Sequence, residues 1–248
     1  MSLKAPVMEI YSAIQGEGKY VGVRQIFLRF LGCNISCRYC DTPASRNMTP
    51  DCLIEESAGE RKFRAAKNPV GVEEVLNAVR NLKPAIHHSL SLTGGEPLLY
   101  PEFLQEFLPF LKEDGIKIFL ETNGTLAGSL RKVLPLIDIV SMDFKLPSAT
   151  GEKDFSSPHK EFMEIAGNKE FYIKMTLTDD TVDEEIERAL KIISNSGKSI
   201  QLFLQPATPA GNVLAPGIDK LRRWQEQSLQ YLLDVRVIPQ THKMLKEI

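Results

Sequence analysis

The sequence predicts an α/β fold, a partial, open βα barrel on a parallel sheet of about six strands. From Gly71 onward, strand-like segments alternate with segments whose apolar residues recur at helical spacing. Polar and glycine-containing motifs repeatedly follow the strand ends, and that edge carries the active site in barrels. The number of βα units is too small for a closed eight-stranded barrel, and a doubly wound open sheet is the structural alternative.

The composition is that of an ordinary globular protein. The chain has 248 residues, of which 43% are hydrophobic and 25% are charged, and its formal net charge is −2. This length fits one large α/β domain spanning residues 1–248, or at most two small domains. The small net charge argues against a duplex nucleic-acid partner, and no run of roughly 18 apolar residues predicts a membrane span. Because the N-terminus lacks a signal-peptide core, we expect a reducing, cytoplasmic location.

The first elements lie before the cysteines. Residues 7–20 begin like a strand and end in a glycine loop, which is either a flexible turn or a lid over a small ligand. Residues 25–31 are branched and aromatic on both faces, as buried parallel strands are. Arg29 interrupts that strand, which is costly unless the guanidinium is paired. It therefore forms a structural salt bridge or grips a ligand carboxylate.

Residues 43–69 are predicted to be an insertion after the cysteine loop. The segment is polar and contains several helix- and strand-breaking residues, among them Pro50 and Gly59. We expect it to be irregular, with a helix around Leu53–Glu60. Cys52 lies in the insertion, and nothing around it has metal-ligand spacing, so we interpret it as an ordinary thiol.

The remaining elements follow in regular order. Further strands are expected at 89–93, 117–121, 137–143, 171–177, 200–204 and 235–238. Helices are expected where apolar residues recur at helical spacing, at 72–82, 101–114, 126–134, 158–166, 179–196 and 219–233. Pro109 should kink the second of these helices.

Three cysteines, Cys33, Cys37 and Cys40, lie within one short loop after residues 25–31. So tight a loop does not easily close a strain-free disulfide, so a metal or cluster is the better interpretation. A structural zinc site needs a fourth ligand, and the candidates are not at finger-like spacing: Cys52, His87, His88, His159 and His242. The spacing therefore favours a [4Fe-4S] cluster with one iron that no cysteine binds.

The cysteine loop and a second motif resemble the radical S-adenosylmethionine superfamily. That motif is the Gly-Gly-Glu-Pro turn at 94–97, one strand after the cysteines. The resemblance implies that the open iron binds S-adenosylmethionine and that one electron releases a 5′-deoxyadenosyl radical. It also implies cofactor-binding residues at later strand ends: Gly95, Glu96, Asn123, Asp143, Lys145 and Gln205. Asp143 and Lys145 have the alternative of a structural ion pair.

Four further stretches resemble the 7-carboxy-7-deazaguanine synthase family of the queuosine and archaeosine routes. They are Ile-Gln-Gly-Glu-Gly at 14–18, Phe-Leu-Arg-x-x-Gly-Cys at 27–33, Cys-Asp-Thr at 40–42 and Pro-Gln-Thr-His-Lys at 239–243. This resemblance implies ring contraction of 6-carboxy-5,6,7,8-tetrahydropterin with loss of ammonia. It implies Mg²⁺ held by Thr42, which by its position alone would be a helix cap. It implies substrate contacts from Ile14, Gln15, Gly16, Arg29 and Thr93.

The same resemblance implies a homodimer, in which Trp224 or the insertion could line the interface, and an electron donor such as flavodoxin or ferredoxin. Three features depart from the family. The insertion at 43–69 is longer than in the family's compact members. Residues 143–145 read Asp-Phe-Lys in place of Ser-Pro-Lys, and the chain continues past Pro239, where some members end in a carboxylate near the substrate. A glycyl-radical activating enzyme and a non-catalytic iron–sulfur or zinc protein are the alternatives. The Gln-Gly-Glu-Gly and Cys-Asp-Thr motifs favour a small substrate.

Overall fold

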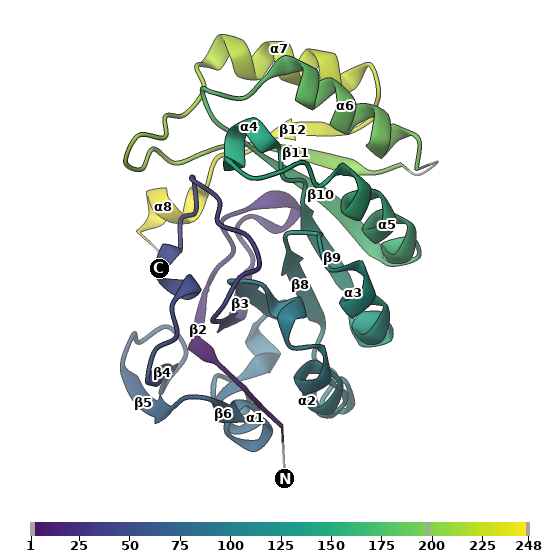
Figure 1. Cartoon of the computed structure of the whole chain (residues 1–248). Coiled ribbons are helices and arrows are strands. Elements are labelled where there is room, and N and C mark those ends of the chain that lie inside the picture. Colours follow the sequence, from purple (N-terminus) through teal and green to yellow (C-terminus); the bar gives the residue numbers. More distant parts are fainter. Residues whose placement is uncertain (1–2, 197–198, 247–248) are drawn as a thin grey trace.

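The computed structural model describes residues 3–196 and 199–246. Within them, ten strands form one curved sheet in the order β12-β11-β10-β9-β8-β7-β3-β2-β4-β5 (Figure 1). Strands β3 and β7 to β12 run parallel to one another. They lie within two residues of the predicted strands: β3 Arg24–Phe30, β7 Leu90–Gly94, β8 Ile118–Thr122, β9 Ile139–Asp143, β10 Glu170–Leu177, β11 Gln201–Pro206 and β12 Val235–Val237.

The sheet is wider than predicted because the N-terminal segment and the insertion extend it. Strand β2 (Val7–Ile14) pairs antiparallel with β3, and β4 (Asp51–Glu55) pairs parallel with β2. Strand β5 (Phe63–Lys67) returns antiparallel to β4, while β1 (Lys4–Ala5) pairs with β6 (Val70–Gly71) in a separate ribbon. The cysteine loop therefore follows the third strand of the chain rather than the first.

The predicted helix around Leu53–Glu60 is wrong, because these residues belong to the β4–β5 hairpin. Cys52 and Ile54 are buried while Leu53 is exposed, which is the alternation of a strand with one buried face. The Glu55 carboxylate accepts hydrogen bonds from the backbone N–H groups of Gly59 and Arg61, at 2.9 and 2.8 Å, and so shapes the turn.

The helices cover the outer side of the sheet, each packed against the next (Figure 1). They are α1 Val72–Asn81, α2 Pro101–Glu113, α3 Ala127–Val133, α5 Ser156–Ala166, α6 Asp183–Ser194 and α7 Ile218–Leu229. Helix α2 stays helical through Pro109. Two short helices were not predicted, α4 (Pro147–Thr150) and α8 (Thr241–Leu245). No helix of the described residues is long and apolar enough to cross a lipid bilayer.

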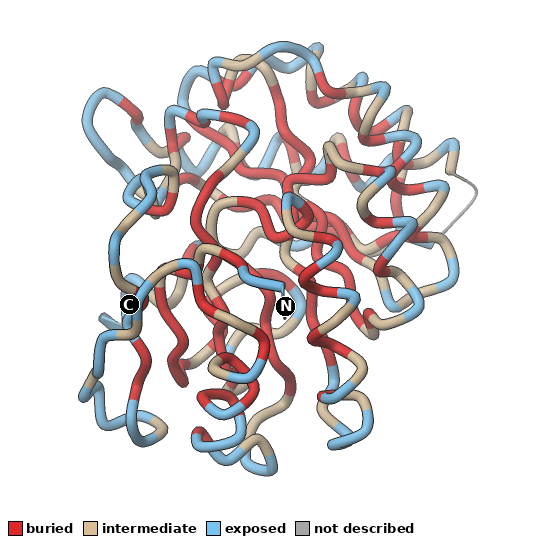
Figure 2. The backbone as a smooth tube through the Cα atoms, turned by 60° about the horizontal axis from the view of Figure 1, so that its bottom comes forward, coloured by how far each residue is buried: buried red, intermediate tan, exposed pale blue. Residues whose placement is uncertain are grey.

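The core lies between the sheet and the helices, where the strands are buried along most of their length (Figure 2). Trp224 of α7 is fully buried, and its indole N–H donates to Asp183 Oδ1 at 2.6 Å. The suggestion that Trp224 lines a dimer interface is therefore wrong.

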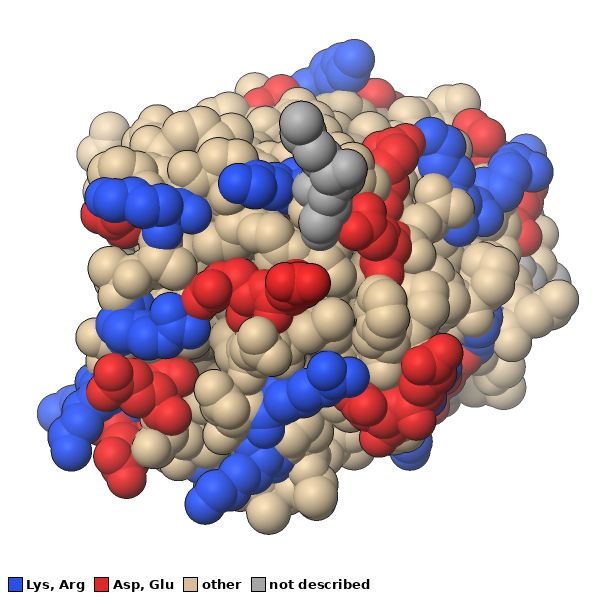
Figure 3. Space-filling view, turned by 90° about the horizontal axis from the view of Figure 1, so that it is seen from below, with Lys and Arg blue, Asp and Glu red and all other residues tan. Residues whose placement is uncertain are grey.

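On the face seen in Figure 3, positive and negative side chains alternate, which gives no large field of one sign there.

Candidate active site

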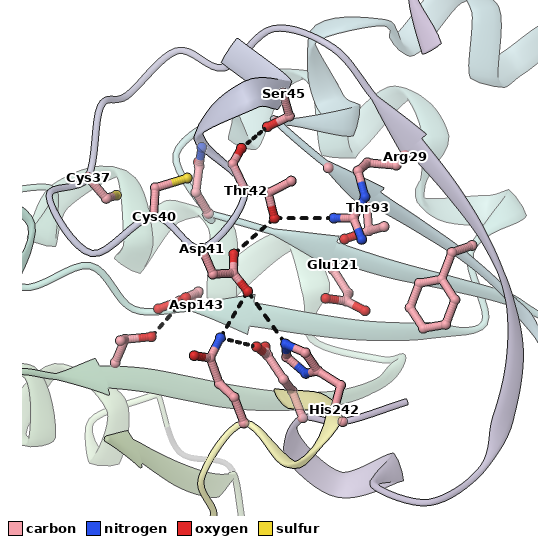
Figure 4. A pocket seen from close by; sticks show the side chains of 18 of the residues that line it. Arg29, Cys37, Cys40, Asp41, Thr42, Ser45, Thr93, Glu121, Asp143 and His242 are labelled. Atoms are coloured by element: carbon pink, nitrogen blue, oxygen red, sulfur yellow. Dashed lines mark hydrogen bonds and ion pairs between the residues drawn. The ribbon is translucent and has the colours of Figure 1, made fainter. Parts of the chain in front are cut away.

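A cavity of about 460 Å³ lies at the carboxyl ends of the parallel strands. Parallel strands bring their carboxyl ends to one edge of a sheet, so residues far apart in the sequence meet there. Every predicted site residue except Glu96 lines this cavity: Ile14, Gln15, Gly16, Arg29, Cys33, Cys37, Cys40, Thr42, Thr93, Gly95, Asn123, Asp143, Lys145 and Gln205. Figure 4 shows part of the cavity wall around Thr42.

The cysteine loop brings three free thiols to the cavity. Burial raises the pKa of the Cys33 and Cys37 thiols, so a bound metal centre is needed to favour their thiolate forms. Of the five fourth ligands considered for zinc, only His242 lines the cavity, and its Nε2 lies 3.7 Å from Asp41 Oδ2. Among the described residues, no group of side chains that could hold one metal ion combines these thiols with a fourth ligand, which fits a cluster with one open iron.

The Gly-Gly-Glu-Pro turn is hydrogen-bonded to the backbone that leads into the cysteine loop. The N–H of Gly95 donates to Phe30 O at 3.0 Å, and the N–H of Glu96 donates to Gly32 O at 2.8 Å. A Cβ atom at position 95 would lie 1.7 Å from Gly32 O. Only glycine allows this approach, so the second glycine of the motif sets the position of the turn beside the cysteines.

The Glu96 carboxylate does not face the cavity. The residue is fully buried, and its carboxylate accepts hydrogen bonds from Leu98 N–H (3.1 Å), Thr122 Oγ1 (2.8 Å) and Asn123 N–H (2.8 Å). These donors come from its own turn and from the end of β8. The geometry therefore supports a positioning role for this carboxylate in place of direct contact with a cofactor.

Asn123 is held from four directions next to the cysteines. Besides its N–H bond to Glu96, its carbonyl accepts from His159 Nε2 at 3.1 Å, and its Oδ1 accepts from Thr125 Oγ1 at 2.6 Å. Its Nδ2 donates to Asn34 Oδ1 at 2.8 Å and lies 3.9 Å from Cys33 Sγ. From the sequence, His159 was a candidate only for a zinc ligand, whereas in the structure its side chain contacts this backbone carbonyl.

His159 predicts an acid-dependent loss of stability. Burial lowers the pKa of His159 from 6.5 to about 4, so the folded protein keeps a neutral imidazole. The unfolded chain binds the extra proton below about pH 6.5, so stability is lost as the pH falls from 6.5 to 4, by about 3 kcal/mol. Urea unfolding of the cluster-free protein measures this loss, and His159→Gln should lack it while keeping an N–H donor. Parallel curves for the two proteins would contradict the assignment.

Arg29 and Thr42 meet in the cavity (Figure 4). Arg29 Nε donates to Glu9 Oε1 at 2.7 Å, and a second guanidinium nitrogen contacts the Tyr11 hydroxyl. The third guanidinium nitrogen lies 3.4 Å from Thr42 Oγ1. Arg29 therefore forms a structural salt bridge and also lines the cavity. Thr42 precedes a 3-10 turn but does not cap it with its side chain, and its hydroxyl donates to Asp41 Oδ1 at 3.0 Å.

The oxygens around Thr42 are those that Mg²⁺ prefers. Burial alone would raise the pKa of Asp41, but contacts with His242, Lys243 and Arg29 hold that pKa well below its usual value. An ionised carboxylate therefore lies beside the Thr42 hydroxyl. Glu17, Asp41 and His242 also offer ligand atoms within 4.8 Å of one another, which makes them a second place where a cation could bind.

Near the carboxyl ends of β9 and β11, two buried side-chain oxygens have no hydrogen-bond partner among the described residues. Lys145 Nζ donates to Asp143 Oδ2 at 2.7 Å and to the Tyr39 hydroxyl at 3.2 Å, so the predicted ion pair is present within the cavity wall. Asp143 Oδ1 and Gln205 Oε1 are buried and have no hydrogen-bond partner among the described residues. Unsatisfied buried acceptors fit a ligand with hydroxyl or amino donors, as the nucleoside part of S-adenosylmethionine has.

Comparison with known proteins agrees with this geometry. Residues 28–193 match the family model of the Radical SAM superfamily. A 7-carboxy-7-deazaguanine synthase from Geobacter sulfurreducens is 42% identical over 98% of each chain, and one from Methanopyrus kandleri is 38% identical over 96% of this chain and 92% of its own. This chain belongs to the radical SAM superfamily and to its 7-carboxy-7-deazaguanine synthase family.

The family assignment and the predicted fold class are both confirmed. The crystal structure of QueE from Escherichia coli has a TM-score of 0.62 to this chain, with 22% identity over 96% of this chain and 95% of that one. A radical SAM methyltransferase from Sphaerobacter thermophilus gives a TM-score of 0.61 with 14% identity, over 94% of this chain and 77% of its own. These structures share the mostly parallel, open sheet with this member of the family.

The C-terminal segment closes the cavity, a function that sequence analysis did not assign to it. Thr241 N–H donates to Gly16 O at 2.9 Å, and a Cβ at Gly16 would lie 2.4 Å from His242 N. Gln240 Nε2 donates to Glu17 Oε1 at 2.8 Å and to Asp41 Oδ2 at 3.0 Å. The motif at 239–243 was visible in the sequence, but its contact with a loop more than two hundred residues away was not.

Proposed function

We propose that this chain converts 6-carboxy-5,6,7,8-tetrahydropterin to 7-carboxy-7-deazaguanine and ammonia, as a radical SAM lyase. The observation that carries the proposal is one cavity that contains the three-cysteine loop, the Arg29 guanidinium and the Thr42 hydroxyl together. The glycine loop at 15–22, which acts as a lid in this proposal, and the C-terminal segment both line that cavity, which suits a small molecule. The substrate loses only the elements of ammonia, so the overall conversion consumes no oxidant or reductant.

The cluster and S-adenosylmethionine would occupy the end of the cavity formed by the strand-end motifs. Cys33, Cys37 and Cys40 would hold a [4Fe-4S] cluster, and the groups around S-adenosylmethionine would be Gly95, Asn123, Asp143, Lys145 and Gln205. When bound, the two cofactors supply a carbon-centred radical that removes a hydrogen atom from the substrate. Glu96 would act by fixing Asn123 against the cysteine loop.

The substrate would lie between the lid and the strand ends. Arg29 can pair with its carboxylate, because a guanidinium presents a planar set of donors that matches two carboxylate oxygens. Gln15 and the backbone of Ile14 and Gly16 would contact the ring, with Thr93 adding a polar contact. Thr42 would bind a Mg²⁺ ion that also binds the substrate, since Mg²⁺ keeps few protein ligands.

Replacing Thr42 tests the magnesium site. Thr42→Ala removes the hydroxyl and should raise the Mg²⁺ concentration for half-maximal turnover about ten- to hundredfold. Thr42→Ser keeps the hydroxyl and should stay near wild type. Steady-state turnover across a Mg²⁺ titration measures the effect. An unchanged Mg²⁺ dependence in Thr42→Ala would show that Thr42 does not bind the ion. The group of Glu17, Asp41 and His242 would then be the alternative site.

The proposed reaction is tested with anaerobically purified, cluster-replete protein. The reduced protein is incubated with S-adenosylmethionine, Mg²⁺ and 6-carboxy-5,6,7,8-tetrahydropterin, and product and ammonia are quantified together. We expect them to form in equal amounts. Cleavage of S-adenosylmethionine without any deazaguanine carboxylate would show that the substrate assignment is wrong while the radical chemistry is right.

Membership of the family supports three further proposals about the protein in the cell. We propose a homodimer, a reductant such as flavodoxin or ferredoxin, and a cytoplasmic location. Analytical ultracentrifugation of the full chain tests the first proposal, and turnover with each purified electron carrier tests the second.

A further inference from the structure

A buried lysine lies between two carboxylates in the cavity wall. Lys174 of β10 forms an ion pair with Glu17 of the lid, and its Nζ lies 3.8 Å from Oε2 of Glu121 in β8. The side chains of Lys174, Glu17 and Glu121 are 6%, 13% and 17% exposed. Burying charged groups to this extent carries a desolvation penalty, and the attraction between the charges does not always offset that penalty. Stability alone is therefore a weak reason for this arrangement.

Neutral donors hold each carboxylate from another side. Glu121 Oε1 accepts from Gln15 Nε2 at 2.8 Å and from Ser91 Oγ at 3.0 Å. Glu17 Oε1 accepts from Gln240 Nε2 at 2.8 Å. The two carboxylates are thus fixed at one part of the cavity, where both line the wall. Ionised carboxylates only accept hydrogen bonds, so together they complement a ligand edge that carries several N–H groups.

We propose that Lys174 is a positioning residue that holds Glu17 and Glu121 as paired acceptors for an amino-amidine edge of the substrate. This inference rests on the proposed function, because a pterin presents such an edge in its 2-amino group and the adjacent ring N–H. Without the ammonium group, the two partly buried carboxylates would repel each other, or one of them would take up a proton. Either change removes an acceptor or moves it.

The electrostatic surroundings of Lys174 agree with this role. Burial alone would lower the pKa of Lys174, but Glu17, Glu121 and Asp143 together raise that pKa above its ordinary value. Lys174 in turn lowers the pKa of Glu17, against the effect of burial. The ammonium form is therefore kept, and the charge that holds the carboxylates in place persists at neutral pH.

The test compares two ligands that differ at the proposed edge. Pterin-6-carboxylate carries the 2-amino group, and lumazine-6-carboxylate has an oxo group there. The cluster-replete protein with S-adenosylmethionine bound should prefer the pterin about tenfold or more, measured as the ratio of dissociation constants. Lys174→Met should lose most of this preference, and Lys174→Arg should keep it. The affinity for S-adenosylmethionine should change far less than the pterin preference in Lys174→Met, although Lys174 and Asp143 line the same cavity.

A charge-balanced double variant separates positioning from folding. Lys174→Met combined with Glu17→Gln leaves the same net charge in this group as wild type, so thermal stability should recover while the pterin preference does not. Lys220→Met removes an exposed ion pair with Asp179 and is the matched control that should change neither property. A pterin preference that survives in Lys174→Met, or that returns in the double variant, would overturn the inference. If wild type binds neither ligand, the proposed function fails, and the inference fails with it.

Discussion

Alanine in place of Cys33, Cys37 or Cys40 is expected to leave the protein without a stable cluster and to reduce turnover to background, on the order of a thousandfold or more. The three thiols are the only cysteines that line the cavity among the described residues. With two of them, a second iron would lose its protein ligand, and the cluster would no longer be held. Iron content, visible absorbance and turnover after anaerobic reconstitution measure the outcome.

Cys52→Ala is the matched control for this prediction. Cys52 is fully buried in β4 and does not line the cavity, and burial raises the pKa of its thiol to about 12. It should therefore be chemically inert, and Cys52→Ala should load a full cluster with near wild-type turnover. Loss of the cluster in Cys52→Ala, or a full cluster in any of the other three variants, would contradict the assignment of ligands.

Gly95→Ala is expected to weaken binding of S-adenosylmethionine by about a hundredfold or more. The added Cβ would lie 1.7 Å from a backbone oxygen, Gly32 O, which no side-chain rotation relieves. The turn must therefore move away from the cysteine loop and break its hydrogen bonds to Phe30 O and Gly32 O. Equilibrium binding of S-adenosylmethionine and the change it causes in the spectrum of the reduced cluster measure the effect.

Gly128→Ala controls for the glycine-to-alanine change itself. Gly128 lies inside helix α3, and nothing lies within 4 Å of a Cβ placed there. This substitution should leave cofactor binding unchanged and stabilise the helix by about 0.5–1 kcal/mol. Equal affinity for S-adenosylmethionine in Gly95→Ala and wild type would show that the turn is not fixed in the way its hydrogen bonds indicate.

Local patterns predicted the fold and most of the cavity wall. The spacing of apolar residues that distinguishes strands from helices is a pattern among neighbours in the sequence. The ends of the parallel strands were therefore predicted to within two residues. Residues that follow different parallel strands, such as Arg29, Thr93 and Gln205, converge because the fold places those ends at one edge. The insertion was misinterpreted because Cys52, Leu53 and Ile54 are too short a run to separate a strand from a helix.

Roles that depend on distant partners could not be predicted from the sequence. Glu96 was expected at the cofactor, but its carboxylate instead accepts hydrogen bonds from the Thr122 hydroxyl and the Asn123 N–H at the end of β8, which only the folded chain brings close. Lys174 is the one charged residue of the predicted strand 171–177, and its partner Glu17 lies 157 residues earlier in the chain. The contact of Thr241 with Gly16 likewise joins the two ends of the sequence. Such pairings follow from the tertiary fold and have no local signal.

The central claim is that one cavity holds the radical source beside the carboxylate-bearing carbon of the substrate. The most direct test uses 6-carboxy-5,6,7,8-tetrahydropterin that carries deuterium on that carbon, with cluster-replete enzyme, reductant, Mg²⁺ and S-adenosylmethionine. The family resemblance implies that the hydrogen atom is removed from that carbon and that S-adenosylmethionine is regenerated afterwards. Mass spectrometry should therefore find deuterium in the recovered S-adenosylmethionine, together with 7-carboxy-7-deazaguanine that has lost the label. Product formation without transfer of deuterium to S-adenosylmethionine, or no product from fully loaded enzyme, would contradict the account.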